Sequence, residues 1–230
     1  MYQINDFKQR QLLDEMLADK VATLLTAAVK AKGKASIAVS GGSTPKGFFQ
    51  ALSNKPLPWS AITITLADER WVGIDSSASN TKLVHENLLQ NEAAKAKFFH
   101  LKQGQALNAT TLAELNLAAE QQLLPLDVLI LGMGEDGHTA SLFPCSEEIT
   151  QCLANDSPAL IKVQPKTAPH QRISFSFSTL AKSKNIFLHI SGVSKKQVLA
   201  QAIAGQESRE MPIRAFLHAP DLNTQVYWAE

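Results

Sequence analysis

The stretch Asp127–Pro144, DVLILGMGEDGHTASLFP, carries the strongest structural signal in this chain of 230 residues. It begins with a short apolar run, Val128–Leu131, and continues into a glycine-rich loop that ends on His138. Short apolar runs closed by turn residues are typical of the buried strands of parallel sheets. In open α/β sheets, ligands bind just beyond the carboxyl ends of such strands. The stretch therefore predicts an α/β fold with His138 at a ligand site.

His138 is a candidate acid–base group, because the ordinary pKa of histidine lies close to neutral pH. For a lone histidine, a solvated turn residue is the stronger alternative, since short motifs are only hypotheses. The surrounding glycines, Gly132, Gly134 and Gly137, shift the balance toward function. The remaining histidines lack such a context, and we expect them to be structural or surface residues: His85, His100, His170, His189 and His218.

Strands and helices are expected to alternate along the chain. Apolar residues at three- and four-residue spacing predict an amphipathic helix over residues 8–31, ended by Gly33. A helix over residues 79–89 is expected to be capped by Ser79 or Asn80. The other expected helices cover residues 45–52, 107–123 and 195–204, and the expected strands cover residues 35–39, 61–66, 128–131, 160–163, 172–177, 185–190 and 225–228.

This alternation predicts a Rossmann-like α/β fold with a mainly parallel sheet and helices on both faces. We expect a single domain over residues 1–230, because the chain has no long flexible linker. The softest boundary is residues 164–170, with Pro165 and Pro169, and we interpret it as a loop rather than a joint between domains.

Composition excludes several classes of partner. The 22 Lys and Arg residues nearly balance the 21 Asp and Glu residues, which argues against binding of nucleic acid or of an anionic membrane. Cys145 and Cys152 match no zinc or redox motif, and we expect neither a metal site nor a cofactor. The start of the chain is too polar for a secretory signal, and no stretch approaches transmembrane length. We therefore expect a cytoplasmic protein, either a monomer or a small homo-oligomer.

A second motif, Ser40–Pro45 (SGGSTP), lies between a predicted strand and a predicted helix. Gly42 lets an anion approach the backbone, and Ser43 and Thr44 offer hydroxyl and amide donors. The helix N-terminus adds a partial positive charge. The motif predicts a phosphate cradle, the alternative being an ordinary glycine-rich turn with a Ser/Thr cap.

Charged residues follow two further strands. Arg70, in Asp68-Glu69-Arg70, is suited to binding phosphate or polarising a carbonyl, and Asp68 to accepting sugar hydroxyls or orienting a base. Lys195 is expected at a helix N-terminus, where the helix dipole disfavours a cation by roughly 0.3 kcal/mol or more, so an anion is expected nearby. Arg172 begins a strand and offers another cation. For each of these groups, a solvated surface charge is the alternative, as the adjacent Lys196 illustrates.

Because the carboxyl ends of parallel strands meet at one edge of a sheet, these loops are expected to converge. Hydroxyls, glycine amides and cations would then surround one histidine and several carboxylates. That composition is expected of a sugar-phosphate site.

Six motifs, in order from Ser40 to Leu199, resemble those of the 6-phosphogluconolactonases, in the glucosamine-6-phosphate isomerase/6-phosphogluconolactonase superfamily. They are SGGSTP, ADERWV, SN, GMGEDGHTASLFP, RISFSFSTL and SGVSKKQVL. The deaminases of this superfamily usually carry Asp-Glu-Tyr in place of Asp68-Glu69-Arg70, and IAFNEP in place of Thr139–Pro144. Both differences favour a lactonase.

The resemblance implies hydrolysis of 6-phospho-D-glucono-1,5-lactone to 6-phosphogluconate in the oxidative pentose phosphate pathway. It implies that His138 activates a water, that Arg70 or loop amides stabilise the oxyanion, and that Asp68 holds sugar hydroxyls or tunes Arg70. The phosphate is expected to lie on Gly42, Ser43, Thr44 and Lys195, with Arg172 as a further contact.

Some alternatives stay open at this stage. The group that orients His138 is Asp68, Glu135 or Asp136, and residues 211–217 receive no role. A glucosamine-6-phosphate deaminase/isomerase and a non-catalytic sugar-phosphate-binding regulator are the two alternative functions.

Overall fold

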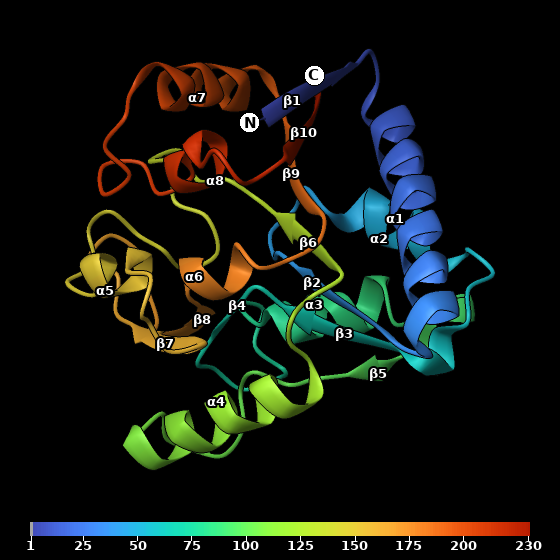
Figure 1. Cartoon of the computed structure of the whole chain (residues 1–230), viewed down its shortest axis with the longest axis horizontal. Helices are drawn as coiled ribbons and strands as arrows, with labels where there is room; N and C mark the ends of the chain where they lie inside the picture. The colour runs from blue at the N-terminus through green and yellow to red at the C-terminus, as the bar shows by residue number, and fades with distance from the viewer. Residues whose placement is uncertain (1) are drawn as a thin grey trace.

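A computed structural model describes residues 2–230 and contains a central seven-stranded sheet (Figure 1). The strand order is β1-β10-β9-β6-β2-β3-β5, and every neighbouring pair runs parallel. The strands are β1 (Tyr2–Phe7), β2 (Ala35–Val39), β3 (Ile62–Leu66), β5 (Lys97–Phe98), β6 (Val128–Leu131), β9 (Ile186–Ser191) and β10 (Thr224–Ala229). Every residue of β2 and β6 is buried, as expected of strands covered on both faces.

Helices cover both faces of this sheet. In Figure 1, α1 and α2 lie to its right and α7 and α8 to its left. The helices are α1 (Arg10–Lys32), α2 (Lys46–Ser53), α3 (Asn80–Asn87), α4 (Ala109–Gln122), α5 (Ile149–Leu153), α6 (Phe177–Leu180), α7 (Val193–Ala204) and α8 (Arg214–His218). The predicted α/β fold with a mainly parallel sheet is confirmed. Within residues 2–230, no helix is both long enough and apolar enough to pass through a membrane.

The local signals at the helix ends are also confirmed. Gly33 ends α1 in the left-handed conformation, with φ 75°, and its N–H donates to the carbonyl of Val29. The hydroxyl of Ser79 caps α3 by accepting from the N–H of Lys82. Helix α7 begins at Val193, two residues earlier than expected, so Lys195 lies in its first turn.

Strand β1 has no counterpart among the expected elements. It is a polar edge strand, YQINDF, that pairs with β10 on one side only. Such a strand is held through its backbone, so it needs no apolar run and leaves little trace in the residue pattern. The short helices α5, α6 and α8 were likewise not expected, because each offers too few residues for a helical period.

A second, three-stranded sheet holds strands that were expected to join the main one. Its order is β4 (Asp68–Arg70), β8 (Arg172–Phe175) and β7 (Leu160–Val163), and both pairs are antiparallel. The tripeptide expected as a loop is therefore a strand, and Arg70 lies opposite Arg172 in the β4–β8 register. Residues 164–170 connect the antiparallel pair β7–β8.

The chain reverses direction across the sheet next to β2. From β2 it proceeds to β3 and β5 on one side, and later to β6 on the other. The loops after β2 and β6 therefore diverge and leave a crevice, which is the position where α/β sheets bind ligands. The hydroxyl of Ser40 joins the two loops, because it donates to the carbonyl of Ile130 and accepts from the N–H of Gly132, both at 3.0 Å.

Asp127 ties elements together at the opposite edge of the sheet. Its buried carboxylate accepts from the N–H of Ser36 at 2.9 Å. The same carboxylate lies 2.9 Å from the ammonium of Lys32 and 3.3 Å from that of Lys184. Asp127 thus joins the end of α1, the start of β2 and the segment before β9.

Asp127→Ala is expected to lower the free energy of unfolding by about 1–3 kcal/mol, because the buried N–H of Ser36 loses its acceptor. Urea-induced unfolding measures this change. Asp156→Ala, at an exposed aspartate, is the matched control. Equal stability of the two variants would contradict a structural role for Asp127.

Candidate active site

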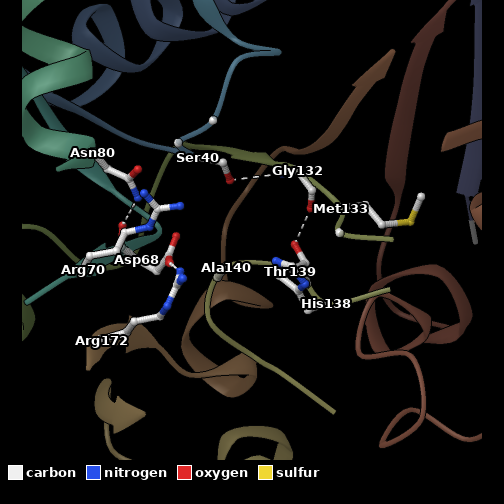
Figure 2. Close-up of a pocket in the computed structure, with 13 residues that line it drawn as sticks. Ser40, Asp68, Arg70, Asn80, Gly132, Met133, His138, Thr139, Ala140 and Arg172 are labelled. Atoms are coloured by element: carbon white, nitrogen blue, oxygen red, sulfur yellow. Dashed lines mark hydrogen bonds and ion pairs between the residues drawn. The ribbon is translucent and has the colours of Figure 1, made fainter. Parts of the chain in front are cut away.

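A cavity of about 170 Å³ opens at the carboxyl edge of the main sheet (Figure 2). In Figure 2, Asp68, Arg70, Asn80 and Arg172 lie on one side of the cavity, and His138 on the other. The lining residues come from the loops after β2 and β6 and from β4, α3 and β8: Ser40, Gly41, Gly42, Asp68, Arg70, Asn80, Gly132, Met133, Gly134, His138, Thr139, Ala140 and Arg172.

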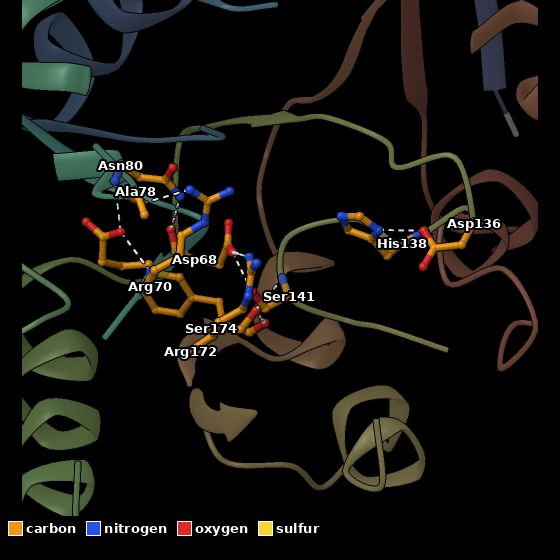
Figure 3. Close-up of polar contacts among 11 residues, drawn as sticks. Asp68, Arg70, Ala78, Asn80, Asp136, His138, Ser141, Arg172 and Ser174 are labelled. Atoms are coloured by element: carbon orange, nitrogen blue, oxygen red, sulfur yellow. Dashed lines mark hydrogen bonds and ion pairs between the residues drawn. The ribbon is translucent and has the colours of Figure 1, made fainter. Parts of the chain in front are cut away.

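The imidazole of His138 is oriented by Asp136. Its Nδ1 lies 2.5 Å from Oδ1 of Asp136, and its backbone N–H donates to the same oxygen at 3.1 Å. Figure 3 shows the other ring nitrogen turned away from Asp136, toward the side of Asp68 and Arg172. Partial burial works in the opposite direction, but the hydrogen bond and charge of His138 lower the pKa of the Asp136 carboxyl below its ordinary value. Of the three open candidates, the structure selects Asp136.

The ring of His138 is also held by packing. It stacks on the ring of Phe143, with 4.0 Å between the centroids and 26° between the planes. It also lies so close to Gly134 that a Cβ there would overlap Nδ1. A side chain at Gly134 would therefore clash with the imidazole. Phe143 gives a structural role to one residue of 139–144, the segment that distinguishes lactonases from deaminases.

Asp68 lies across the cavity from His138 and does not orient it. Its buried carboxylate accepts a hydrogen bond from the hydroxyl of Ser141 and lies 3.7 Å from Nη1 of Arg172. Arg172 in turn lies over the ring of Phe143, with its guanidinium carbon 5.0 Å from the centroid. Burial lowers the pKa of the Arg172 guanidinium, and the charge of Asp68 opposes this effect. Within residues 2–230, the ion pair of Asp68 is with Arg172 and not with Arg70.

Arg70 is held by the start of α3. Its Nη1 donates to the carbonyl of Ala78 at 2.7 Å, whereas its buried Nε has no hydrogen-bond partner within residues 2–230. The neighbouring Glu69 is buried and accepts from the backbone N–H groups of Asn80 and Thr81, at 2.9 and 2.7 Å. A carboxylate at a helix N-terminus is favourable because the free N–H groups and the helix dipole both attract it. Glu69 therefore fixes α3 against β4.

The predicted phosphate cradle borders a second, adjoining cavity of about 230 Å³. The backbone N–H groups of Gly42, Ser43 and Thr44 have no acceptor in the described part of the chain. Lys195 lines the same cavity, and its ammonium lies 2.8 Å from Oε1 of Glu135. Free amides beside a helix N-terminus and a lysine are groups that bind anions in other proteins.

The structure thus brings all eight sequence-predicted site residues to one edge of the sheet, where they line the two cavities. Two participants were not assigned a role from the sequence. Asn80 lines the first cavity, and its side-chain amide donates to the carbonyl of Asp68 at 3.1 Å. Glu69 accepts a hydrogen bond from the backbone N–H of Asn80. The SN motif was a signal for Asn80, but nothing local indicated that Glu69 would turn toward the helix. Within residues 2–230, no group of three or more His, Cys, Asp or Glu side chains is arranged to hold a metal ion.

Comparison with known proteins gives the family. Residues 8–228 match the family described as glucosamine-6-phosphate isomerases/6-phosphogluconolactonase. The chain belongs to this family. A relative from Rhizobium meliloti, named 6-phosphogluconolactonase, is 45% identical over 225 residues, which are 97% of this chain and 97% of that one.

Solved structures of the family superpose over the whole chain. A 6-phosphogluconolactonase from Shewanella baltica has a TM-score of 0.96 at 43% identity, covering 100% of this chain and 98% of that one. A putative 6-phosphogluconolactonase from Neisseria gonorrhoeae has a TM-score of 0.92 at 40% identity, covering 100% of both chains. The family predicted from the six motifs is confirmed.

In this member of the 6-phosphogluconolactonase family, the C-terminal segment supports the loop that carries His138. The N–H of Ile213 donates to the carbonyl of Gly137 at 3.0 Å. Gly137 has φ 74°, and a Cβ there would lie 2.8 Å from the side chain of Met211. Residues 211–217, which received no role from the sequence, therefore hold the loop from behind.

Gly137→Ala is expected to lower the free energy of unfolding by about 1–3 kcal/mol more than Gly104→Ala does. Both glycines have positive φ, but a Cβ at Gly104 would meet open space, so the difference isolates the contact with Met211. Chemical denaturation of the two variants measures it. If the two variants lose equal stability, residues 211–217 do not constrain the loop.

Proposed function

We propose that the protein hydrolyses 6-phospho-D-glucono-1,5-lactone to 6-phosphogluconate, a step of the oxidative pentose phosphate pathway. One observation carries the proposal: His138, paired through Nδ1 with Asp136, turns its other nitrogen toward a cavity edged by cations. The names of the relatives from Rhizobium meliloti and Shewanella baltica support the same substrate. We propose that the enzyme needs no cofactor, because the reaction consumes only the lactone and water. We also propose that it is cytoplasmic.

His138 is the proposed general base and acid. With the Nδ1 proton donated to Asp136, Nε2 is free to take a proton from a water whose oxygen attacks C1 of the lactone. The resulting imidazolium then gives this proton to the ring oxygen as the C1–O bond breaks. The products are the carboxylic acid and a hydroxyl group, and the carboxylic acid loses a proton to solvent. Asp136 stabilises the imidazolium in between, through the same contact.

A serine nucleophile is not part of this mechanism. Ser141 is the serine near His138 in the sequence, but its side chain is fully buried and its hydroxyl donates to Asp68. A hydroxyl committed to a buried carboxylate is not available to attack a carbonyl. The reactive ester of a six-membered lactone also needs only modest activation, for which one positioned base is sufficient.

Arg70 and the loop amides are the proposed donors to the oxyanion that forms at C1. Arg70 lines the cavity of His138, and within residues 2–230 only its Nη1 is engaged by a backbone carbonyl. A donor aimed at developing negative charge in a water-poor site is typically worth about 3 kcal/mol of the barrier. Asp68 is proposed to hold sugar hydroxyls, and Arg172 remains a predicted contact on this side of the site.

The phosphate is proposed to lie on Gly42, Ser43, Thr44 and Lys195. With about −1.5 to −2 charges near neutral pH, it would replace Glu135 as the partner of Lys195. The phosphate would then anchor one end of the substrate while the lactone carbonyl reaches the cavity of His138. Such anchoring raises the rate by fixing the reacting groups in one geometry.

The direct test is generation of the lactone in place by glucose-6-phosphate dehydrogenase. Added protein is expected to speed the disappearance of the lactone beyond spontaneous hydrolysis. No acceleration, together with release of ammonia from glucosamine 6-phosphate, would assign the protein to the deaminases instead.

His138→Ala is expected to reduce kcat about 10²–10⁴-fold, because the base is lost. Binding of 6-phosphogluconate, measured by calorimetry, is expected to change little, since the phosphate contacts remain. His100→Ala is the control, because His100 packs on Phe98 at the β5 edge of the sheet. Near-normal turnover by His138→Ala would remove His138 from catalysis.

Lys195→Ala is expected to raise KM on the order of tenfold with a smaller effect on kcat, because a charged contact to the phosphate is lost. Lys196→Ala is a matched control on the same helix. Its ammonium lies 3.9 Å from the ring centroid of Trp228 and 3.5 Å from Asp6, outside both cavities. Steady-state kinetics compares the two variants, and a larger KM effect from Lys196→Ala would refute the assignment.

A further inference from the structure

The first residue of α1 touches the phosphate cradle from behind. Nη2 of Arg10 donates to the carbonyl oxygens of Ser43 and Thr44, at 3.0 and 2.8 Å. Hydrogen bonds from a charged donor are stronger than neutral ones. Arg10 lines neither of the two cavities of the site, so it does not itself meet the ligand.

The contact with Ser43 sets the direction of a cradle amide. The carbonyl of Ser43 and the N–H of Thr44 belong to one planar trans peptide, so they point in opposite directions. With the carbonyl held toward Arg10, the N–H of Thr44 points away from α1. This N–H has no acceptor within residues 2–230, and Thr44 lines the cavity of Lys195. Arg10 therefore holds this peptide with its N–H turned away from α1 and free of any partner within residues 2–230.

The second contact fixes the end of the loop. The carbonyl of Thr44 belongs to the peptide before Pro45, which carries no N–H. This bond therefore orients no donor, but it holds the loop where α2 begins. Together the two bonds define the position of the chain between Ser43 and Pro45.

Helix α1 is itself fixed, so Arg10 acts from a rigid support. Asp14 lies four residues after Arg10, on the same helix face, and is buried. Its Oδ1 lies 3.3 Å from Nε2 of the buried His189 in β9. Its other oxygen packs so closely on Gly47 that a Cβ there would overlap it. Asp14 thus packs α1 against β9 and against the first turn of α2, although its Oδ1 and Nε2 of His189 make no hydrogen bond within residues 2–230.

The position of Arg10 is unfavourable for the helix alone. It is the first residue of α1, where the helix dipole repels a cation. A cation at this place is explained by its bonds to the cradle. The long distance in sequence between Arg10 and the four site loops explains why the motifs do not include it.

We propose that Arg10 is a positioning residue that holds the phosphate cradle in its binding geometry. The proposal rests on the proposed function, in that the ligand of the cradle is the phosphate of a sugar phosphate. It makes α1 part of the binding machinery, acting through the backbone of Ser43 and Thr44.

The test compares Arg10→Met with Lys20→Met, which removes an exposed cation from the same helix. Arg10→Met is expected to raise KM for the lactone, and Kd for 6-phosphogluconate and for inorganic phosphate, on the order of tenfold. We expect kcat to stay close to that of the unchanged protein, because His138 is not affected. Arg10→Lys is expected to recover part of the affinity, since an ammonium is able to donate to two carbonyls.

Salt separates positioning from simple attraction. At about 1 M salt, the screening length is ~3 Å, and a distant charge adds little to phosphate binding. If Arg10 acts by positioning, the ratio of Kd between Arg10→Met and the unchanged protein persists at high salt. If the ratio falls to one, Arg10 acts through its charge and the proposal is overturned.

The binding measurements keep this proposal separate from the proposed function. Calorimetry with 6-phosphogluconate and phosphate needs no turnover, so Arg10 is testable even if the lactone is not the substrate. The melting temperature of Arg10→Met shows whether this variant is destabilised. If it is, the Kd values of Arg10→Lys and Lys20→Met are compared instead. Equal Kd values for Arg10→Met and Lys20→Met would overturn the proposal.

Discussion

The hydroxyl of Ser40 joins the carboxyl ends of the two central strands, and the whole site is arranged around this contact. It donates to the carbonyl of Ile130 in β6 and accepts from the N–H of Gly132, the first residue of the loop that follows. The loop after β2 is thereby kept beside the loop after β6, although the chain continues from β2 toward one side of the sheet and reaches β6 on the other. One becomes the phosphate cradle and the other carries His138. A substrate with an anion at one end and a reacting carbonyl at the other needs a constant distance between these two loops.

Carboxylates hold the groups of the site in place. Asp136 orients His138, Asp68 pairs with Arg172, Glu69 fixes α3, and Asp14 lies against His189 and Gly47 where α1 packs on the sheet. Each meets a cation, a histidine or free N–H groups, because an unpaired charge in the interior would be costly. The result is a site in which cations face the cavities and the acids that position them lie behind or beside them. This arrangement favours an anionic ligand.

Much of the fold could be predicted from local pattern. The buried strands β2 and β6 are apolar runs, and Gly33 and Ser79 end and begin helices as their chemistry requires. Strand β1 and the antiparallel sheet could not be predicted in the same way. The polar strand β1 is stabilised by its pairing with β10, from the other end of the chain, and β4 exists because β8 lies beside it. Pairing between distant segments leaves no periodic signal in either one.

The sequence by itself determined the family, the cradle motif and the identity of the histidine, since these depend on short runs of residues with a definite chemistry. Only the tertiary structure decided which carboxylate serves which partner. Asp136, Glu135 and Asp68 are equivalent candidates in the sequence, yet they pair with His138, Lys195 and Arg172 respectively. It also brought Arg10 to the back of the cradle. The physical reason is that ion pairs and hydrogen bonds depend on distances of a few ångströms, and those distances are set by packing between segments far apart in the chain.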